Sequence, residues 1–160
     1  MKILIWTGQH DILRSIIEFV THGKGGHAAF LRSDNKTIHE VFWPRVRDRK
    51  LTQRDIRNTE SYEIEGITKK QSREFEKLFD RSIESNIKYS IIDLFRFAFN
   101  MPSRSEKHTF CSKYILTCCS KILTEEQMPL VRLKYKNWAS PRDLRISPKL
   151  KPCVLEPDTQ

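Results

Sequence analysis

Hydrophobic and polar residues recur along the chain with two periods, which predict strands and helices. Apolar or alternating runs of strand character cover residues 2–6, 27–31, 37–43, 60–67 and 130–135. Helical spacing of apolar residues covers 11–20, a segment that follows a Thr68–Gln71 capping box, 90–99 and 110–123. These elements predict an α+β fold. We expect the helix over 90–99 to be buried, because it is apolar on most sides.

Glycine-rich and charged segments connect these elements. The glycines of 22–26 end the first helix, and 33–36 predicts a turn that joins the strands on either side into a hairpin. The charged segment 45–58 has few apolar anchors and is expected to be a loop with one helical turn. No linker or repeat divides the chain. We therefore expect one domain over 1–160, with a core over about 2–147 and an extended C-terminal tail.

The composition is that of a folded, basic protein. Lys and Arg total 29 against 20 Asp and Glu, a formal net charge of +9. This excess favours anionic partners such as nucleic acid, acidic lipid headgroups or cell-wall polymer, although the basic residues are scattered along the chain. No apolar run is long enough for a signal peptide or a membrane span, which predicts a cytoplasmic protein with no integral membrane segment.

The helix over 110–123 carries the most informative pattern. Its apolar positions form one stripe that begins at Cys111: Tyr114, Ile115, Cys118, Cys119, Ile122 and Leu123. Thr109 is placed to cap this helix. A thiol at a helix N-terminus has a lowered pKa, and the unpaired N–H groups there can hold an oxyanion. Cys111 is therefore a candidate nucleophile; the alternative is that it is simply the first core residue of the stripe.

The remaining cysteines predict no site. Cys118 and Cys119 lie in the middle of the stripe and are expected to fill the core, and Cys153 has no evident partner. Because no CxxC pair occurs, the sequence predicts neither a zinc site nor a disulfide framework, and a reducing compartment is the simpler assumption.

Two of the five histidines are candidates for a catalytic base. His27 opens a strand after the glycine-rich turn, and His39 lies 12 positions further on, in the next strand of the predicted hairpin. A base with a second polar group to orient it is the arrangement that thiol catalysis needs. His10, His22 and His108 are interpreted as ordinary surface or hydrogen-bonded residues.

The order of these motifs resembles a known family. Gly26-His27-Ala28-Ala29-Phe30, followed by His39 and then by Phe110-Cys111-Ser112-Lys113-Tyr114-Ile115, is similar to the permuted NlpC-type hydrolases. The lecithin–retinol acyltransferase-like enzymes belong to the same group. Two weaker matches are Lys88-Tyr89-Ser90, where Ser90 replaces an Asp, and Ser140-Pro141-Arg142-Asp143-Leu144.

The resemblance implies a circularly permuted papain-like fold, in which a small antiparallel sheet or barrel packs against a helix that carries the nucleophile at its N-terminus. Cys111 takes the place of the nucleophile, His27 that of the base and His39 that of the third polar residue. Glu40 is the alternative third residue, because a bulge or a one-residue change in the turn would present it instead. Tyr89 would line the cleft and assist the oxyanion.

The resemblance also implies the chemistry. We expect a cysteine peptidase or amidase that forms an acyl-thioester on a peptide or amide substrate, such as a cell-wall peptide, with no metal or other cofactor. The alternative is a hydrolase or acyltransferase that acts on lipid or thioester acyl groups. A second alternative follows from charge alone: a non-enzymatic nucleic-acid-binding protein that uses the basic run 45–50.

Overall fold

The computed structural model describes residues 1–7, 26–98, 108–129 and 139–155, which form an α+β fold. Its eight strands are β1 (Lys2–Trp6), β2 (His27–Leu31), β3 (Thr37–Phe42), β4 (Arg45–Lys50), β5 (Thr59–Ile64), β6 (Lys88–Tyr89), β7 (His108–Thr109) and β8 (Leu150–Cys153). They make one sheet in the order β7-β6-β4-β3-β2-β1-β5-β8. All neighbours are antiparallel except β6 and β7, which are parallel.

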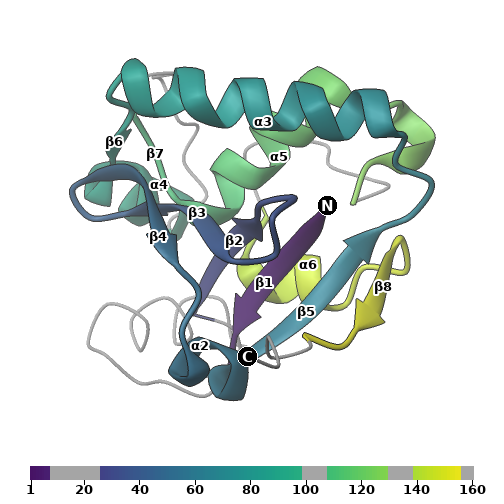
Figure 1. The fold of residues 1–160 in the computed structure, drawn as a ribbon. Coiled ribbons are helices and arrows are strands. Elements are labelled where there is room, and N and C mark those ends of the chain that lie inside the picture. Colours follow the sequence, from purple (N-terminus) through teal and green to yellow (C-terminus); the bar gives the residue numbers. More distant parts are fainter. Residues whose placement is uncertain (8–25, 99–107, 130–138, 156–160) are drawn as a thin grey trace.

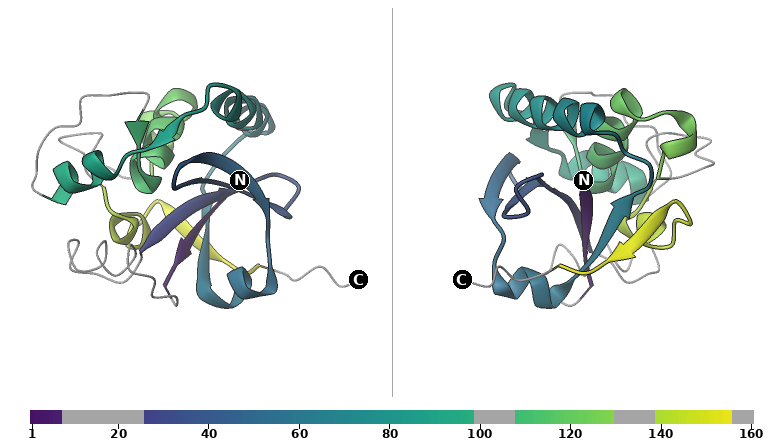
Figure 2. Two further views of the ribbon diagram at one scale, coloured as in Figure 1. Left: turned by 90° about the vertical axis from the view of Figure 1, so that its left-hand side faces the viewer. Right: turned by 45° about the vertical axis from the view of Figure 1, so that its right-hand side comes forward.

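The described helices cover the sheet unevenly. They are α2 (Gln53–Asn58), α3 (Lys69–Glu84), α4 (Ile91–Ala98), α5 (Cys111–Ile122), a 3₁₀ turn η1 (Glu125–Gln127) and α6 (Pro141–Arg145). Helices α3, α4 and α5 gather on one side, and α2 lies at the opposite end (Figures 1 and 2). Helix α5 packs on β2 and β3, and α3 packs on α5.

The centre of the sheet is buried on both faces. Ile3, Leu4 and Ile5 of β1 have no exposed surface, as expected for a continuous apolar run between two neighbouring strands. Ile3 and Ile5 belong to a large core cluster with residues of α3 and α5, whereas Leu4 and Trp6 belong to a smaller cluster on the other face. The alternation of side chains along a strand explains this division.

The α3 helix begins and packs as its sequence predicts. Thr68 and Gln71 form a capping box, in which each side chain binds the backbone N–H of the other. Phe75 and Phe79, one turn apart, have no exposed surface and pack against Phe30 of β2 with ring centroids 5.5 and 5.1 Å away. These aromatic contacts fix α3 over the sheet.

Most predicted elements are confirmed. Strands are found at 2–6, 27–31, 37–42 and 59–64, and helices follow Thr68 and Phe110 as expected. The predicted helix over 11–20 and the predicted strand over 130–135 lie outside the described residues.

Two expectations about local structure were wrong. Residues 45–50 form strand β4 rather than a loop, because Arg47 and Arg49 of this charged run pair with Glu40 on the neighbouring strand. Helix α4 is not buried throughout, since Ile92 and Phe95 are 68% and 53% exposed. Beyond residue 147 the tail includes the edge strand β8, which pairs with β5.

We expect Phe79→Ala to lower the free energy of unfolding by about 3–5 kcal/mol, because it removes a fully buried ring from the contact between α3 and the sheet. Ile83→Ala, on the same helix but at a 40% exposed position, should cost less than about 1 kcal/mol. Urea unfolding measures both. Equal losses would contradict this placement of the core.

Candidate active site

Cys111 is the first residue of α5, at the end where the helix leaves backbone N–H groups without intrahelical acceptors. The N-cap residue is Phe110, which makes no side-chain capping bond. The Thr109 hydroxyl donates to the Phe110 carbonyl at 3.4 Å, so the expectation that Thr109 caps this helix was wrong. The N-terminus of α5 therefore carries no capping side chain, and its N–H groups face the region of the thiol.

The Cys111 thiol is buried, with 2% of the residue exposed, and it lies against β2. Burial alone would raise its pKa. The hydrogen bond with His27, the positive charge of that ring and the backbone N–H groups of Ala28 and Ser112 outweigh burial, and the pKa of the Cys111 thiol falls below its usual value of 9.0. A thiol with a lowered pKa beside an imidazole is a candidate nucleophile.

His27 contacts both a thiol and a carboxylate. Its Nε2 lies 3.1 Å from Oε2 of Glu40, so Nδ1 is the ring nitrogen left to face Cys111. Burial lowers the pKa of His27, but the hydrogen bonds to Cys111 and Glu40 and the negative charges of both groups raise it from 6.5 to about 9. Near neutral pH the imidazole is therefore protonated beside the two acidic groups.

Two aromatic rings hold the His27 imidazole. Its centroid lies 5.1 Å from that of Trp6 and 5.8 Å from that of Phe42, which presents an edge. Only 4% of His27 is exposed. These rings limit rotation of the imidazole and exclude water, and a low local dielectric strengthens its contacts with charged groups.

Glu40 is a buried carboxylate that stays ionised. Its Oε1 accepts hydrogen bonds from Nε of Arg47 and Nε of Arg49, each at 2.9 Å, and its Oε2 faces His27. Burial raises the pKa of Glu40, but His27 and the two guanidinium groups lower it to about 2. The carboxylate is 2% exposed, so its charge is stabilised by these three partners rather than by water.

His39 does not contact His27, so the preference for His39 over Glu40 as the orienting group was wrong. Its Nδ1 lies 2.6 Å from Oδ1 of Asp48, and its Nε2 lies 2.8 Å from the hydroxyl of Tyr114. The ring also stacks on Phe79 with centroids 4.2 Å apart. His39 thus belongs to a buried polar network between the sheet and α5.

The register of the hairpin explains this outcome. Phe30 of β2 lies opposite His39 of β3, so these two side chains share one face of the sheet. Side chains alternate between the faces of a strand, and Glu40 therefore shares the face of Phe42 and His27, while His39 points to the other face.

Tyr89 lies near the nucleophile along the backbone. In the parallel β6–β7 pair Tyr89 lies opposite Thr109, and Thr109 precedes Cys111 by two positions. The Tyr89 side chain is buried in the core cluster. The expectation that the Tyr89 hydroxyl assists an oxyanion stays a prediction.

The segment that follows Ser140 packs beside the nucleophile helix. The Ser112 hydroxyl donates to the carbonyl of Ala139, and Ser140 and Asp143 form the capping box of α6. On the other side, Lys113 Nζ lies 3.3 Å from Asp93 of α4, and both side chains are buried. Neither contact was anticipated, because Ser112 and Lys113 lie beside the apolar stripe rather than on it.

Sequence reasoning also missed Arg47 and Arg49 as site residues. Glu40 lies opposite Arg47 in the β3–β4 pair. The signal was present in the sequence, because Arg45, Arg47 and Arg49 alternate with other residues and so can share one face of a strand. Treating the segment as a loop concealed that pattern.

The other reactive groups lie elsewhere. Cys118 and Cys119 are buried in the core, as expected. Cys153 is on β8, where its Sγ lies 3.4 Å from Oγ of Ser61. The placement of His10 and His22 falls outside the described residues.

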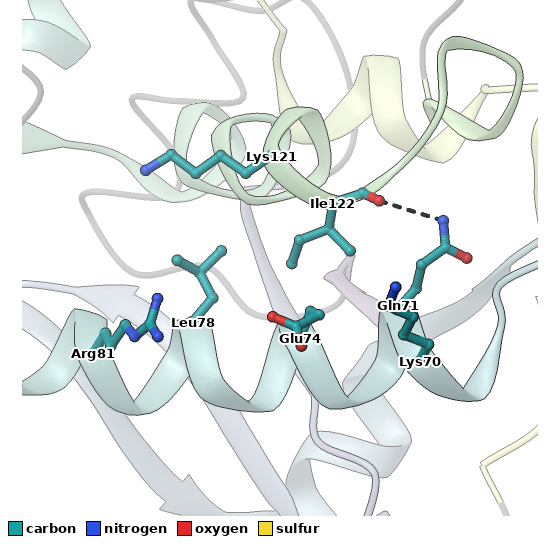
Figure 3. A pocket seen from close by; sticks show the side chains of 7 residues that line it. All are labelled: Lys70, Gln71, Glu74, Leu78, Arg81, Lys121 and Ile122. Carbon is teal, nitrogen blue, oxygen red and sulfur yellow. Dashed lines mark hydrogen bonds between the residues drawn. The ribbon is translucent and has the colours of Figure 1, made fainter.

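A hollow of about 410 Å³ lies between α3 and the end of α5, lined by Lys70, Gln71, Glu74, Leu78, Arg81, Lys121 and Ile122 (Figure 3). Gln71 donates to the carbonyl of Ile122 at 3.3 Å across it. Because an α-helix rises about 1.5 Å per residue, Lys121 is about 15 Å along α5 from Cys111. This hollow is therefore separate from the thiol.

The described residues contain no cluster of three or more side chains suited to hold a metal ion. None of the helices described has the length and apolar character needed to cross a membrane. No protein-family model matches the chain, and no curated protein matches it.

The pH dependence of Cys111 alkylation tests the contact with His27. A thiolate forms as the pH rises through the thiol pKa, and the contact with His27 lowers that pKa in the wild type, so labelling by iodoacetamide should begin at a lower pH than for an ordinary thiol. In His27→Asn the burial of the thiol remains and its imidazole partner is lost, which raises the midpoint above that of the wild type. Peptide mass spectrometry follows Cys111 alone. Identical midpoints in the two proteins would contradict the contact.

A comparison of the alkylation midpoints of Cys111 in Glu40→Gln and His39→Asn tests which of the two residues orients His27. Glu40→Gln should raise the midpoint and slow labelling at pH 7 about tenfold, because His27 loses its negative neighbour. His39→Asn should lower the free energy of unfolding by about 1–3 kcal/mol through lost contacts with Asp48 and Tyr114, and leave the midpoint unchanged. The reverse pattern would restore His39 as the orienting residue.

Proposed function

We propose that this protein is a cysteine-dependent hydrolase that cleaves an amide or peptide bond through an acyl-thioester on Cys111. The observation that carries the proposal is the position of His27, which hydrogen-bonds to both Cys111 and the Glu40 carboxylate in a buried site. This is the nucleophile, base and orienting group that thiol catalysis requires.

The chemistry follows from these contacts. The thiol proton lies on His27 at the start of the reaction, and the Cys111 thiolate attacks the carbonyl carbon to give a tetrahedral oxyanion. The Cys111 N–H, at the first position of α5, is available by geometry to stabilise that oxygen. His27 then gives its proton to the leaving amine, and the acyl group stays on sulfur.

Hydrolysis of the thioester uses the same groups. His27 accepts a proton from water as the water oxygen attacks the thioester carbon, and the proton returns to the departing Cys111 sulfur as the acid is released. Glu40 remains ionised throughout and stabilises the imidazolium in each step, with Oε2 3.1 Å from Nε2. No step requires a metal ion.

The order of the elements supports a circularly permuted papain-like fold. The sheet strands that carry His27 and Glu40 precede the helix that carries Cys111 in the chain, whereas the order in papain itself is the reverse. The packing of α5 on β2 and β3 is the helix-on-sheet arrangement that the resemblance implies.

A second candidate, hydrolysis or transfer of acyl groups from lipids or thioesters, is favoured by exposed apolar residues near the site. Trp43 is 58% exposed and directly follows Phe42, whose ring contacts His27. The Tyr89 N–H donates to the Pro44 carbonyl, which brings this turn close to the start of α4, where Ile92 and Phe95 are also exposed. Exposed apolar side chains on neighbouring segments suit an acyl chain or a lipid surface.

The nucleic-acid alternative has less support. Arg47 and Arg49 of the run 45–50 bind Glu40, and Asp48 binds His39, so three charged side chains of this run are engaged inside the protein. A cytoplasmic, reducing setting suits the proposed hydrolase, because the four cysteines are unpaired and a catalytic thiol must remain reduced.

Intact-mass measurement with an acyl electrophile tests the nucleophile. The wild type and Cys153→Ala should each gain one acyl group at neutral pH, whereas Cys111→Ala should gain none, because Cys111 hydrogen-bonds to the His27 imidazole. Incubation with peptidoglycan fragments should release amine. A separate incubation with mixed phospholipid vesicles should show no loss of lipid.

The outcomes separate the alternatives. Fatty-acid release that requires Cys111 would favour the lipid candidate over the amidase. Labelling that persists in Cys111→Ala but disappears in Cys153→Ala would refute the assignment of the nucleophile.

A further inference from the structure

The Glu40 carboxylate is one member of a closed circuit of contacts around His27. Glu40 accepts from Arg49 Nε at 2.9 Å, and Arg49 donates through both terminal nitrogens to Asp55 of α2, at 2.6 and 2.9 Å. Asp55 in turn accepts from the indole N–H of Trp6 at 3.3 Å. The Trp6 ring contacts His27, which closes the circuit.

Each contact in this circuit restricts the next group. A guanidinium that binds one carboxylate through two parallel N–H groups has a fixed plane, and its Nε then points in one direction. In Arg49 that direction is toward Oε1 of Glu40. With Oε1 engaged, the carboxylate presents Oε2 to Nε2 of His27.

Asp55 is itself held on several sides. It is 7% exposed, and its carboxylate accepts from the backbone N–H and the hydroxyl of Thr52, at 3.0 and 2.7 Å. This is the capping box of α2, so the helix terminus and the arginine share one carboxylate. Helix α2 thereby fixes the position of the Asp55 carboxylate that binds Arg49.

We propose that Arg49, anchored by Asp55, is a positioning residue for the thiol site: it aims the Glu40 carboxylate at His27 and thereby sets the reactivity of Cys111. The inference rests on the proposed function, and it adds residues of β4 and α2 to the machinery. Arg49 touches neither the thiol nor the imidazole and acts through Glu40.

Arg47 binds the same oxygen but is the weaker determinant. Its side chain is 43% exposed, against 26% for Arg49, and its guanidinium lies over the Phe42 ring at 4.6 Å. Solvent screens an exposed charge, and within the described part of the chain the Arg47 guanidinium binds no second carboxylate equivalent to Asp55. Substitution of Arg49 should therefore change the alkylation midpoint of Cys111 more than substitution of Arg47.

The other charged groups near the site are already paired. Lys113 of α5 binds Asp93 of α4, and Arg96 lies 3.7 Å from the same carboxylate. On β3, His39 binds Asp48, which also binds Arg32. The Arg47, Arg49 and Asp55 substitutions below leave these pairs in place, so a change in the Cys111 midpoint in those variants reports on the Glu40 side of the site.

The experiment compares the pH profile of Cys111 alkylation in matched arginine variants of the full chain. Arg49→Gln should raise the midpoint by about one pH unit, which slows labelling at pH 7 about tenfold, because Glu40 loses one of its two guanidinium partners and is no longer held toward His27. Arg49→Lys, which keeps the charge but not the double contact with Asp55, should recover part of that rate. Arg47→Gln should move the midpoint less.

Arg32→Gln is the matched control. Arg32 also binds three carboxylates, those of Asp48, Glu76 and Asp80, but none of them is Glu40. This variant should lose stability in urea and keep the wild-type midpoint. If Arg49→Gln does not fold, Asp55→Asn carries the same test, because it releases Arg49 while leaving its charge in place.

Two outcomes would overturn the proposal in distinguishable ways. A wild-type midpoint in both Arg49→Gln and Asp55→Asn, with a raised midpoint in Glu40→Gln, would refute the positioning role of Arg49. That result would not contradict the proposed hydrolase function. A wild-type protein whose Cys111 titrates as an ordinary thiol would overturn both the role of Arg49 and the proposed function.

Discussion

The site depends on one buried contact, the 3.1 Å hydrogen bond between Nε2 of His27 and Oε2 of Glu40. A carboxylate that is 2% exposed is stable as an anion only when other groups replace water around it. Here an imidazole and two guanidinium groups do so, and they lower the pKa of Glu40 to about 2. The same charge holds the proton on His27, and the protonated ring lowers the pKa of the Cys111 thiol.

The fold supplies this contact through the register of three strands. The β2–β3 pair puts His27 and Glu40 on one face, and the β3–β4 pair sets Arg47 opposite Glu40. The packing of α5 on β2 then brings its N-terminal thiol to the imidazole. A shift of one residue in either pair would reverse the face of every side chain involved, so register determines whether a site exists at all.

Much of this arrangement could be predicted from the sequence, and the failures have physical causes. The stripe that begins at Cys111 and the glycine-rich turn before His27 indicated the two halves of the site. The choice between His39 and Glu40 failed because spacing along one strand does not define its register with the next. The Arg49 contact was missed because charged alternation in β4 resembles a solvated loop until the partners across the sheet are known.

An NMR titration of the His27 ring nitrogens reports most directly on the charge state that the site depends on. With labelled histidine, and with His27→Asn to assign the signal, an activated thiol–imidazole pair predicts that His27 stays doubly protonated well above pH 6.5 and titrates near pH 9. Replacement of Glu40 by Gln should move that titration toward lower pH. A His27 ring that is neutral at pH 7.5 in the wild type would contradict the paired, charged site.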